Sequence, residues 1–225
     1  MSWRPTRNEG RADRDHLSVI ARMAPPAFWA LMATLSIVWS LMLVVQGGWM
    51  DHVLLSRIYV GGHAGLTNLA RTITHLGSWR VLYPVLALAA ALLLFQKRIR
   101  AAFLVLAIPI SGRWLVLFQK HEFALMRPPK ELHLVQIQGM AFPSGHTASA
   151  TMAYLSSALL FAGAGHLRAS SRSAVIGLAV ILSIIVGCSR IMLAVHWPAD
   201  VVGGWAFGGA WTLACLRLAE IIIVD

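Results

Sequence analysis

The sequence predicts an all-α membrane protein: a bundle of six transmembrane helices, with short amphipathic helices at the membrane surface between the first and second spans. Three observations predict this class. Hydrophobic residues make up 58% of the chain and charged residues only 12%, about half the charged fraction of a typical soluble domain. Apolar runs suited to crossing about 30 Å of hydrocarbon recur along the sequence. The net charge of +10 comes mostly from segments between those runs.

The length of each apolar run sets its predicted span. The second run, residues 79–95, is short and needs its flanking residues to complete a crossing. The segment 47–78 differs, because its apolar residues recur at roughly helical spacing and are interrupted by Gly61 and Gly62. It predicts two short amphipathic helices on the outer face of the membrane. The six spans are placed at residues 27–46, 79–95, 101–119, 147–165, 174–190 and 199–218.

The N-terminal end is expected to lie in the cytoplasm. Residues 1–24 are polar, contain five arginines and form the predicted tail, and residues 25–225 form the single membrane domain. No small-residue cleavage site follows the first run, which favours a retained span over a cleaved signal peptide. This orientation places eleven basic residues on the cytoplasmic side and eight on the other. Cys188 and Cys215 then fall near opposite faces, so no disulfide is expected.

Three polar clusters interrupt the apolar pattern, each at the end of an apolar run. They are Lys120 with Arg127-Pro128, the segment 143–146, and the segment 189–200. Ionisable side chains next to hydrocarbon are costly and usually functional. In the predicted topology all three clusters face the non-cytoplasmic side, so we expect them to form one anion-binding site.

Several of these residues suit the binding of a phosphoryl group. Lys120, Arg127 and Arg190 supply positive charge, and the planar guanidinium fork matches phosphate oxygens. Ser144 and Gly145 stand where the fourth span begins, and the free N–H groups of a helix start favour an anion. Singly, each has an ordinary explanation: the cations could be interfacial anchors, and the Pro-Ser-Gly turn could be simple helix capping.

The two histidines suit the transfer step. His196 lies four residues before Asp200, a spacing that lets the carboxylate bind one ring nitrogen and leaves the other free to attack phosphorus. His146 lies next to the phosphate-binding turn and is placed to protonate the leaving oxygen. The alternative is that His196 and Asp200 only hold a loop together. The joint occurrence of all three clusters on one side of the membrane favours a catalytic site.

Together the clusters resemble the three-part signature of the type 2 phosphatidic acid phosphatase family. The resemblance covers residues 120–200. The segment 51–77 resembles the upstream region of the family more weakly, through Ile73-Thr74-His75-Leu76-Gly77. The matching pattern is Lys120-x6-Arg127-Pro128, then Pro143-Ser144-Gly145-His146, then Ser189-Arg190-x5-His196-x3-Asp200.

The resemblance implies a membrane phosphatase that uses no metal or other cofactor and acts through a phosphohistidine intermediate. It implies that His196 is the nucleophile, Asp200 its orienting partner and His146 the general acid. The residues that it places around the phosphate are Lys120, Arg127, Ser144, Gly145 and Arg190. The implied partner is a phosphorylated lipid in the bacterial inner membrane, with the site facing the periplasm.

Undecaprenyl diphosphate is the leading candidate for this lipid, on the prior of the family and not on particular residues. Phosphatidylglycerophosphate, phosphatidic acid and lipid A stay open as substrates. Transfer of the phosphoryl group to a second lipid instead of water also stays open, because the two reactions differ only in the final acceptor.

Other classes of function fit less well. Nucleic-acid binding is disfavoured because the basic residues are scattered and form no basic helix. A transporter is disfavoured because the chain shows no convincing internal repeat.

Arg113 lies on the same helix face as Lys120, about 10 Å deeper. Its candidate partners are Asp51, Glu122 and the lipid headgroup, and snorkelling to the interface is the alternative.

Overall fold

A computed structural model describes residues 23–163 and 168–224, and this part of the chain is helical, with no strand. The all-α class is therefore confirmed, whereas almost all of the predicted cytoplasmic tail lies outside the described residues. The helices are α2 (Pro25–Val45), α3 (Trp49–Ile58), α4 (Ala64–His75), α5 (Trp79–Phe95), α6 (Ile99–Phe123), the 3₁₀ helix η1 (Lys130–Leu132), α7 (Gly145–Ala162), α8 (Ala169–Met192) and α9 (Pro198–Val224).

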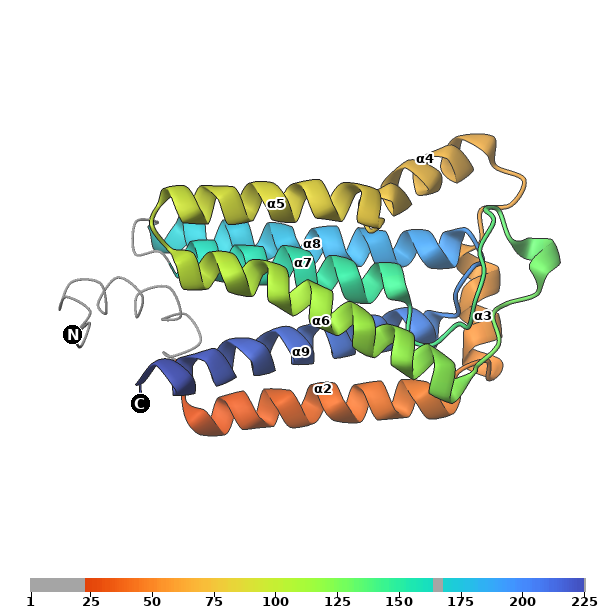
Figure 1. Ribbon diagram of the computed structural model, residues 1–225. Coiled ribbons are helices and arrows are strands. Elements are labelled where there is room, and N and C mark those ends of the chain that lie inside the picture. The colour runs from red at the N-terminus through yellow and green to blue at the C-terminus, as the bar shows by residue number, and fades with distance from the viewer. Residues whose placement is uncertain (1–22, 164–167, 225) are drawn as a thin grey trace, which may run out of the picture.

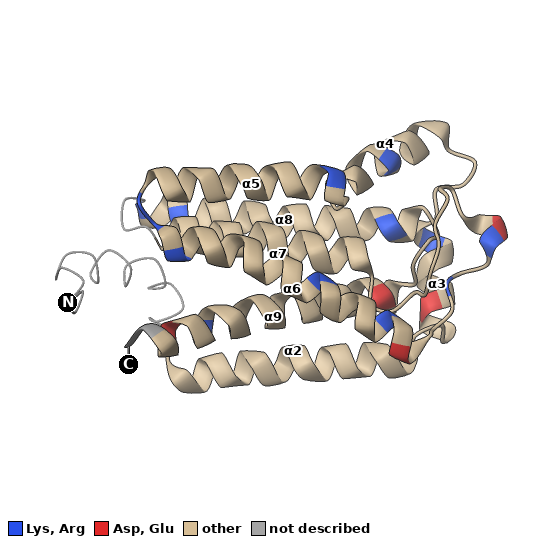
Figure 2. Ribbon diagram, viewed as in Figure 1, with Lys and Arg blue, Asp and Glu red and all other residues tan. Residues whose placement is uncertain are grey.

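The long helices α2 and α5 to α9 run side by side as a bundle (Figure 1). At one end of the bundle α3 crosses it and α4 leans outward, and the loop between α6 and α7 covers the same end. Helix α7 is central, since it packs against α5, α6, α8 and α9. Charged positions gather toward the two ends of the bundle, as Figure 2 shows. The end that carries α3 therefore brings several helix termini and loops together.

Four helices, α2, α6, α8 and α9, are long and apolar enough to cross a membrane. A fifth crossing results if α4 and α5, which meet at an angle of 42°, form one bent span. The predicted span in α7 does not reach the same hydropathy, because five of its 18 residues are Ser or Thr. The other helices surround α7, so its hydroxyl groups face neighbouring helices and its own carbonyls, as in Thr151 Oγ1 to Thr147 O. The chain is an integral membrane protein with four or five crossings by length and composition.

Two helices do occupy the segment between the first and second predicted spans. The break between α3 and α4 falls at 59–63, where Gly62 has a φ of +89°, a conformation that favours glycine. Apolar side chains on both helices are exposed, among them Leu54, Leu66 and Leu69. Such faces suit the membrane interface that the sequence predicts for them.

Arg113 does not pair with either acidic residue considered for it. Its guanidinium lies 4.5 Å from the ring centre of Trp79, in a cation–π contact that joins α6 to the start of α5. The carboxylate of Glu122 lies 3.2 Å from Nδ1 of His121, and Asp51 binds backbone amides, as described below. The ring gives this half-buried cation a partner within the protein.

Cys188 and Cys215 are both free thiols, as expected.

Glycines on α9 bring it unusually close to α7. A Cβ added at Gly204 would lie 3.0 Å from Ser144 O, and one at Gly208 would lie 2.9 Å from Ala148 O. Neither backbone oxygen can move without shifting α7. Small residues one turn apart are a common means of close helix contact in membranes. The packing therefore sets the distance between the first turns of α7 and α9, where the predicted site residues lie.

We expect Gly208→Ala to destabilise the protein by roughly 1–3 kcal/mol, because the added methyl group forces the two helices apart. Gly177→Ala on α8 is the matched control, since a Cβ there would contact nothing within 4 Å. The control should be neutral or slightly stabilising, by up to about 1 kcal/mol from helix propensity. Thermal unfolding in detergent measures both. Equal melting temperatures for the two variants would contradict the close-packing argument.

Candidate active site

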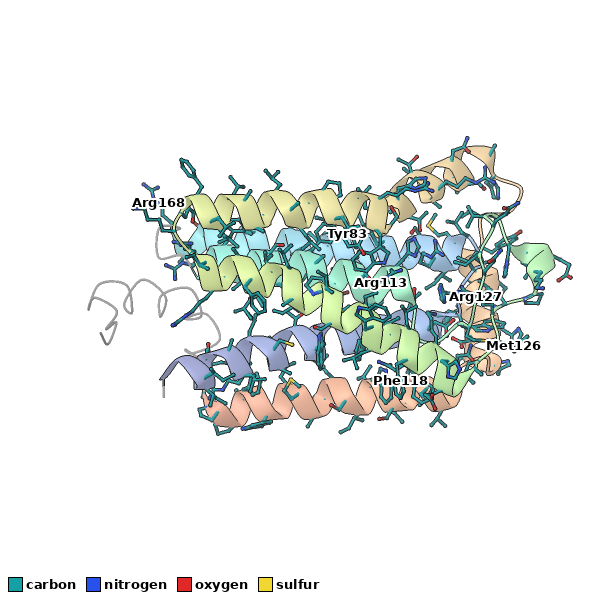
Figure 3. All side chains as sticks on the ribbon, in the orientation of Figure 1. Tyr83, Arg113, Phe118, Met126, Arg127 and Arg168 are labelled. Carbon is teal, nitrogen blue, oxygen red and sulfur yellow. The ribbon has the colours of Figure 1, made fainter. Side chains whose placement is uncertain are left out.

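The predicted site residues converge at the α3 end of the bundle. They come from the last turns of α6, the following loop, the first turn of α7, and the α8–α9 connection. Figure 3 shows Arg127 at this end and Arg168 at the opposite one. Lys120 is close enough to interact electrostatically with Arg127, Arg190 and Asp200. His146 is close enough to interact with Lys120, Arg127 and Arg190. Clusters that are far apart in sequence thus form one region.

The turn that ends α8 directs both Arg190 and His196 into this region. Val195 N–H donates to Arg190 O at 3.2 Å, and Ala194 N–H donates to Ile191 O at 2.8 Å. Together these bonds form a Schellman motif. Its left-handed position is Ala194, with a φ of +51°, instead of the usual glycine. The chain reverses sharply there, so that the last turn of α8 and the residue that follows the motif face the same space.

His196 is held by partners on both ring nitrogens. Its Nδ1 lies 3.1 Å from Asp200 Oδ2, which also accepts the Trp197 N–H at 2.9 Å. Its Nε2 lies 3.0 Å from Arg127 Nη1. A guanidinium can only donate, so Nε2 carries the lone pair and Nδ1 carries the proton given to the carboxylate. This is the tautomer in which Nε2 is a nucleophile.

The surroundings keep the His196 ring neutral. His196 is 1% exposed, and burial holds its pKa well below the usual value, with the positive charge of Arg127 as the next cause. Burial also lowers the pKa of Arg127, and the carboxylate of Asp200 opposes that shift. The guanidinium nevertheless stays charged, because arginine is not deprotonated in proteins. The neutral imidazole thus lies next to a permanent cation.

Arg190 presents one edge of its guanidinium without a partner. The side chain is 2% exposed, and Nη1 donates to Thr74 Oγ1 at 2.7 Å. Nε and Nη2 are buried and have no hydrogen-bond partner among the described residues. These two nitrogens form the side fork that binds phosphate or carboxylate in bidentate fashion. An unpaired buried charge is costly, so this edge is suited to an anion.

Carbonyls of the α6–α7 loop hold the other two cations. Lys120 Nζ donates to Met140 O and Ala141 O, both at 2.7 Å. Arg127 Nε donates to Gly139 O at 2.8 Å, and its Nη2 donates to Met140 O at 3.0 Å. Both side chains are half-buried. The loop thereby holds two positive charges close to His196.

The first turn of α7 supplies backbone N–H groups. Ser144 is fully buried, its N–H donates to Asp200 O at 2.9 Å, and its Oγ accepts from Thr147 Oγ1 at 2.9 Å. The helix begins at Gly145, and the N–H groups of a first turn have no partner within the helix. His146 follows and is partly exposed, at the open side of the cluster. The site is therefore deep at Arg190 and His196 and open at His146.

Asp51 belongs to the support of this site, a role that the sequence did not predict. It is 4% exposed, and its carboxylate accepts the Gly47 N–H at 2.7 Å and the Ala199 N–H at 2.8 Å. Burial raises its pKa, and the two backbone hydrogen bonds oppose the shift. Asp51 thus fastens the α2–α3 turn to the first turn of α9, which carries Asp200. The sequence feature that could have indicated this role is the presence of an acidic residue in a largely apolar segment.

Thr74 is the second residue that the sequence left without a role. Its hydroxyl is the partner of Arg190, and Gly77, three residues later, packs against His146. Both belong to the upstream segment that resembles the family only weakly, and that resemblance was the one available signal.

In the described ranges, no three His, Cys, Asp or Glu side chains are grouped as metal ligands would be.

Known proteins with similar sequences are named as phosphatases of phosphorylated lipids. Phosphatidylglycerophosphatase B of Bacillus subtilis (strain 168) is 29% identical over 143 residues, which cover 64% of this chain and 70% of the relative. Decaprenylphosphoryl-5-phosphoribose phosphatase of Mycobacterium tuberculosis is 30% identical over 150 residues, with 64% and 75% covered.

A solved structure shows the same fold. The crystal structure of a transmembrane PAP2-type phosphatidylglycerolphosphate phosphatase from Bacillus subtilis superimposes with a TM-score of 0.78 at 23% identity. The superposition covers 85% of this chain and 96% of that one. The model of the PAP2 superfamily matches residues 101–222, which contain all three clusters. With more than half of its length matched by that model, this chain is a member of the PAP2 superfamily.

Proposed function

We propose that this protein is a membrane lipid phosphatase that works through a phosphohistidine at His196. One observation carries the proposal: Asp200 and Arg127 bind opposite nitrogens of one buried ring, so the Nε2 lone pair points to the side where the cations gather. A phosphoryl group needs a nucleophile in line and positive charge around its equatorial oxygens. This region of the described chain supplies both.

The reaction has two steps. In the first, Arg127 Nη1 leaves Nε2 of His196 and binds a phosphate oxygen, and Nε2 attacks phosphorus. The bond from phosphorus to the leaving oxygen breaks, and the protonated His146 gives that oxygen a proton. In the second, water attacks the phosphohistidine and gives a proton to His146, and the P–N bond breaks. Inorganic phosphate leaves and both histidines return to their starting state. Asp200 stabilises the positive charge that develops on the ring of His196, as an orienting carboxylate does in hydrolytic triads.

Phosphate binding falls to the cations and the start of α7. The free edge of Arg190 takes two phosphate oxygens, and the N–H groups at Gly145 face the same anion. Lys120 and Arg127 exchange loop carbonyls for phosphate oxygens, because a dianion competes strongly with neutral acceptors. These groups supply the charge neutralisation that a metal ion provides in other phosphatases. The proposed reaction is therefore metal-independent.

The site is proposed to face the periplasm in a bundle of six crossings. Helix α7 has 18 residues, about 27 Å of helix, and runs alongside the four clearly apolar spans (Figure 1). In this proposal the bent pair of α4 and α5 counts as one of the six crossings. The basic loop between α5 and α6 and Arg168 lie at the end opposite α3 (Figures 1 and 3). By the positive-inside rule this arrangement supports an active end that faces outward.

The proposed substrate is a phosphorylated lipid, with undecaprenyl diphosphate first. Two relatives are named for other phosphorylated lipids, phosphatidylglycerophosphate and a decaprenylphosphoryl sugar phosphate. Both names describe a phosphate group carried by a lipid. Exposed apolar faces on α3 and α4 beside the site suit a substrate that reaches it from the bilayer.

The test is phosphate release by the purified protein in detergent with EDTA, given undecaprenyl diphosphate and phosphatidylglycerol phosphate in parallel. We expect release that EDTA does not reduce, and a higher kcat/KM for the diphosphate. Loss of release in EDTA with recovery on adding a divalent cation would contradict metal independence. Turnover only after addition of a second lipid would identify a phosphotransferase. A folded protein that releases phosphate from neither lipid would contradict the proposed substrates.

A further inference from the structure

The junction between α4 and α5, residues Thr74 to Gly77, lies against the phosphate-binding residues, and the proposed reaction assigns it nothing. We propose that Thr74 is a positioning residue, which holds the Arg190 guanidinium so that its Nε–Nη2 edge faces the phosphate. The inference rests on the proposed function. Its central contact is the bond of 2.7 Å from Arg190 Nη1 to Thr74 Oγ1, in which both side chains are buried.

The shape of the guanidinium makes this contact directional. The group is planar, and Nη1 lies away from the edge formed by Nε and Nη2. A bond to Nη1 therefore fixes the direction of the other two nitrogens. Nη1 is the guanidinium nitrogen of Arg190 with a partner among the described residues, whereas Nε and Nη2 are buried without one. Thr74 thus binds the one nitrogen that leaves the phosphate-binding fork free.

Thr74 can orient Arg190 only if its own position is fixed, and three contacts fix it. Tyr154 Oη on α7 donates to Leu76 O at 2.7 Å. A Cβ added at Gly77 would lie 2.5 Å from Val186 Cγ1 on α8 and 3.2 Å from His146 Cβ on α7. The α4–α5 junction therefore packs tightly against α7 and α8, which carry His146 and Arg190. Because the junction is clamped, the hydroxyl of Thr74 has a fixed position relative to the phosphate site.

The test compares Thr74→Val, which keeps the shape of the side chain but removes the hydroxyl, with Thr74→Ser, which keeps the hydroxyl. Two quantities are measured: kcat and KM for phosphate release from phosphatidylglycerol phosphate, and Kd for orthovanadate from the shift of the melting temperature. Thr74→Val should raise both KM and the vanadate Kd about tenfold or more, because a misdirected guanidinium binds the oxyanion less well. Thr74→Ser should stay within about threefold of the unmodified protein.

A second background separates positioning from simple packing. Arg190→Lys removes the planar fork, so adding Thr74→Val to it should change the vanadate Kd by less than about twofold. A full further tenfold loss in that background would overturn the proposal, as would equal losses in the Val and Ser variants. Normal KM and normal vanadate binding in Thr74→Val would overturn the role of Thr74 as well. In that case, phosphate release by the unmodified protein would still support the proposed function. An unmodified protein that neither releases phosphate nor binds vanadate would overturn both.

Discussion

His196→Ala is expected to reduce phosphate release by on the order of 10⁴–10⁶-fold, because loss of a covalent nucleophile costs up to about 10⁶-fold in a serine protease. The ring is the group whose lone pair faces the cation cluster, so no intermediate forms without it. The measurement is single-turnover phosphate release, together with trapping of an acid-labile phosphoenzyme from a labelled lipid. Unmodified protein should carry the label, and the variant should not.

The matched control for this experiment is His63→Ala. His63 is exposed at the start of α4 and contributes nothing to the cluster, so its removal should leave turnover unchanged. Melting temperature and elution volume show whether His196→Ala stays folded, which matters because the ring is buried. Retention of more than about one hundredth of the activity by a folded His196→Ala protein would mean that another group is the nucleophile.

Asp200→Asn is expected to lower kcat by about 10²–10⁴-fold, with the larger value known for the equivalent change in a serine protease triad. Oδ2 of Asp200 accepts two N–H groups, from Nδ1 of His196 and from Trp197. An amide with its NH₂ at that position would repel both and favour the wrong tautomer of the ring. An amide with its oxygen there would keep the contacts but lose the charge that stabilises the ring during attack. Single-turnover rates measure the loss.

Asp51→Asn is the informative comparison for Asp200→Asn. Asp51 is also a buried carboxylate that accepts two backbone N–H groups, but it does not touch His196. Its replacement should lower the melting temperature more than it lowers kcat, and the loss of kcat should be well below that of Asp200→Asn. Equal losses of kcat in the two variants would contradict a direct electrostatic role for Asp200.

Much of the site could be predicted because its chemistry is encoded over short distances in the sequence. His196 and Asp200 are four residues apart, and their hydrogen bond joins the residue two positions before α9 to the first turn of that helix. Ser144 and Gly145 mark the beginning of α7 through their residue types alone. Hydropathy likewise located the apolar helices, because each must cover its own backbone with apolar side chains in lipid.

Helix α7 shows where hydropathy reaches its limit. Its sequence is more polar than the sequences of α2, α6, α8 and α9, yet it lies at the centre of the bundle. Neighbouring helices shield its Ser and Thr side chains from lipid, and only their packing decides that. The partner of Arg113 was missed for a related reason. An aromatic face, which local sequence does not mark as a cation partner, took the place of a carboxylate.

The sequence by itself determined the helical class, the superfamily resemblance and the residues of the candidate site. The tertiary structure decided how those residues are held. Arg127 meets His196 across 69 positions of sequence, Arg190 meets Thr74 across 116, and Asp51 meets Ala199 across 148. Contacts of this kind depend on which helix ends become neighbours when the bundle packs, and local periodicity carries no information about that. Residue spacing within one helix turn decides which side chains can form a local pair, such as His196 and Asp200. The packing of helices that are distant in sequence decides which way such a pair faces.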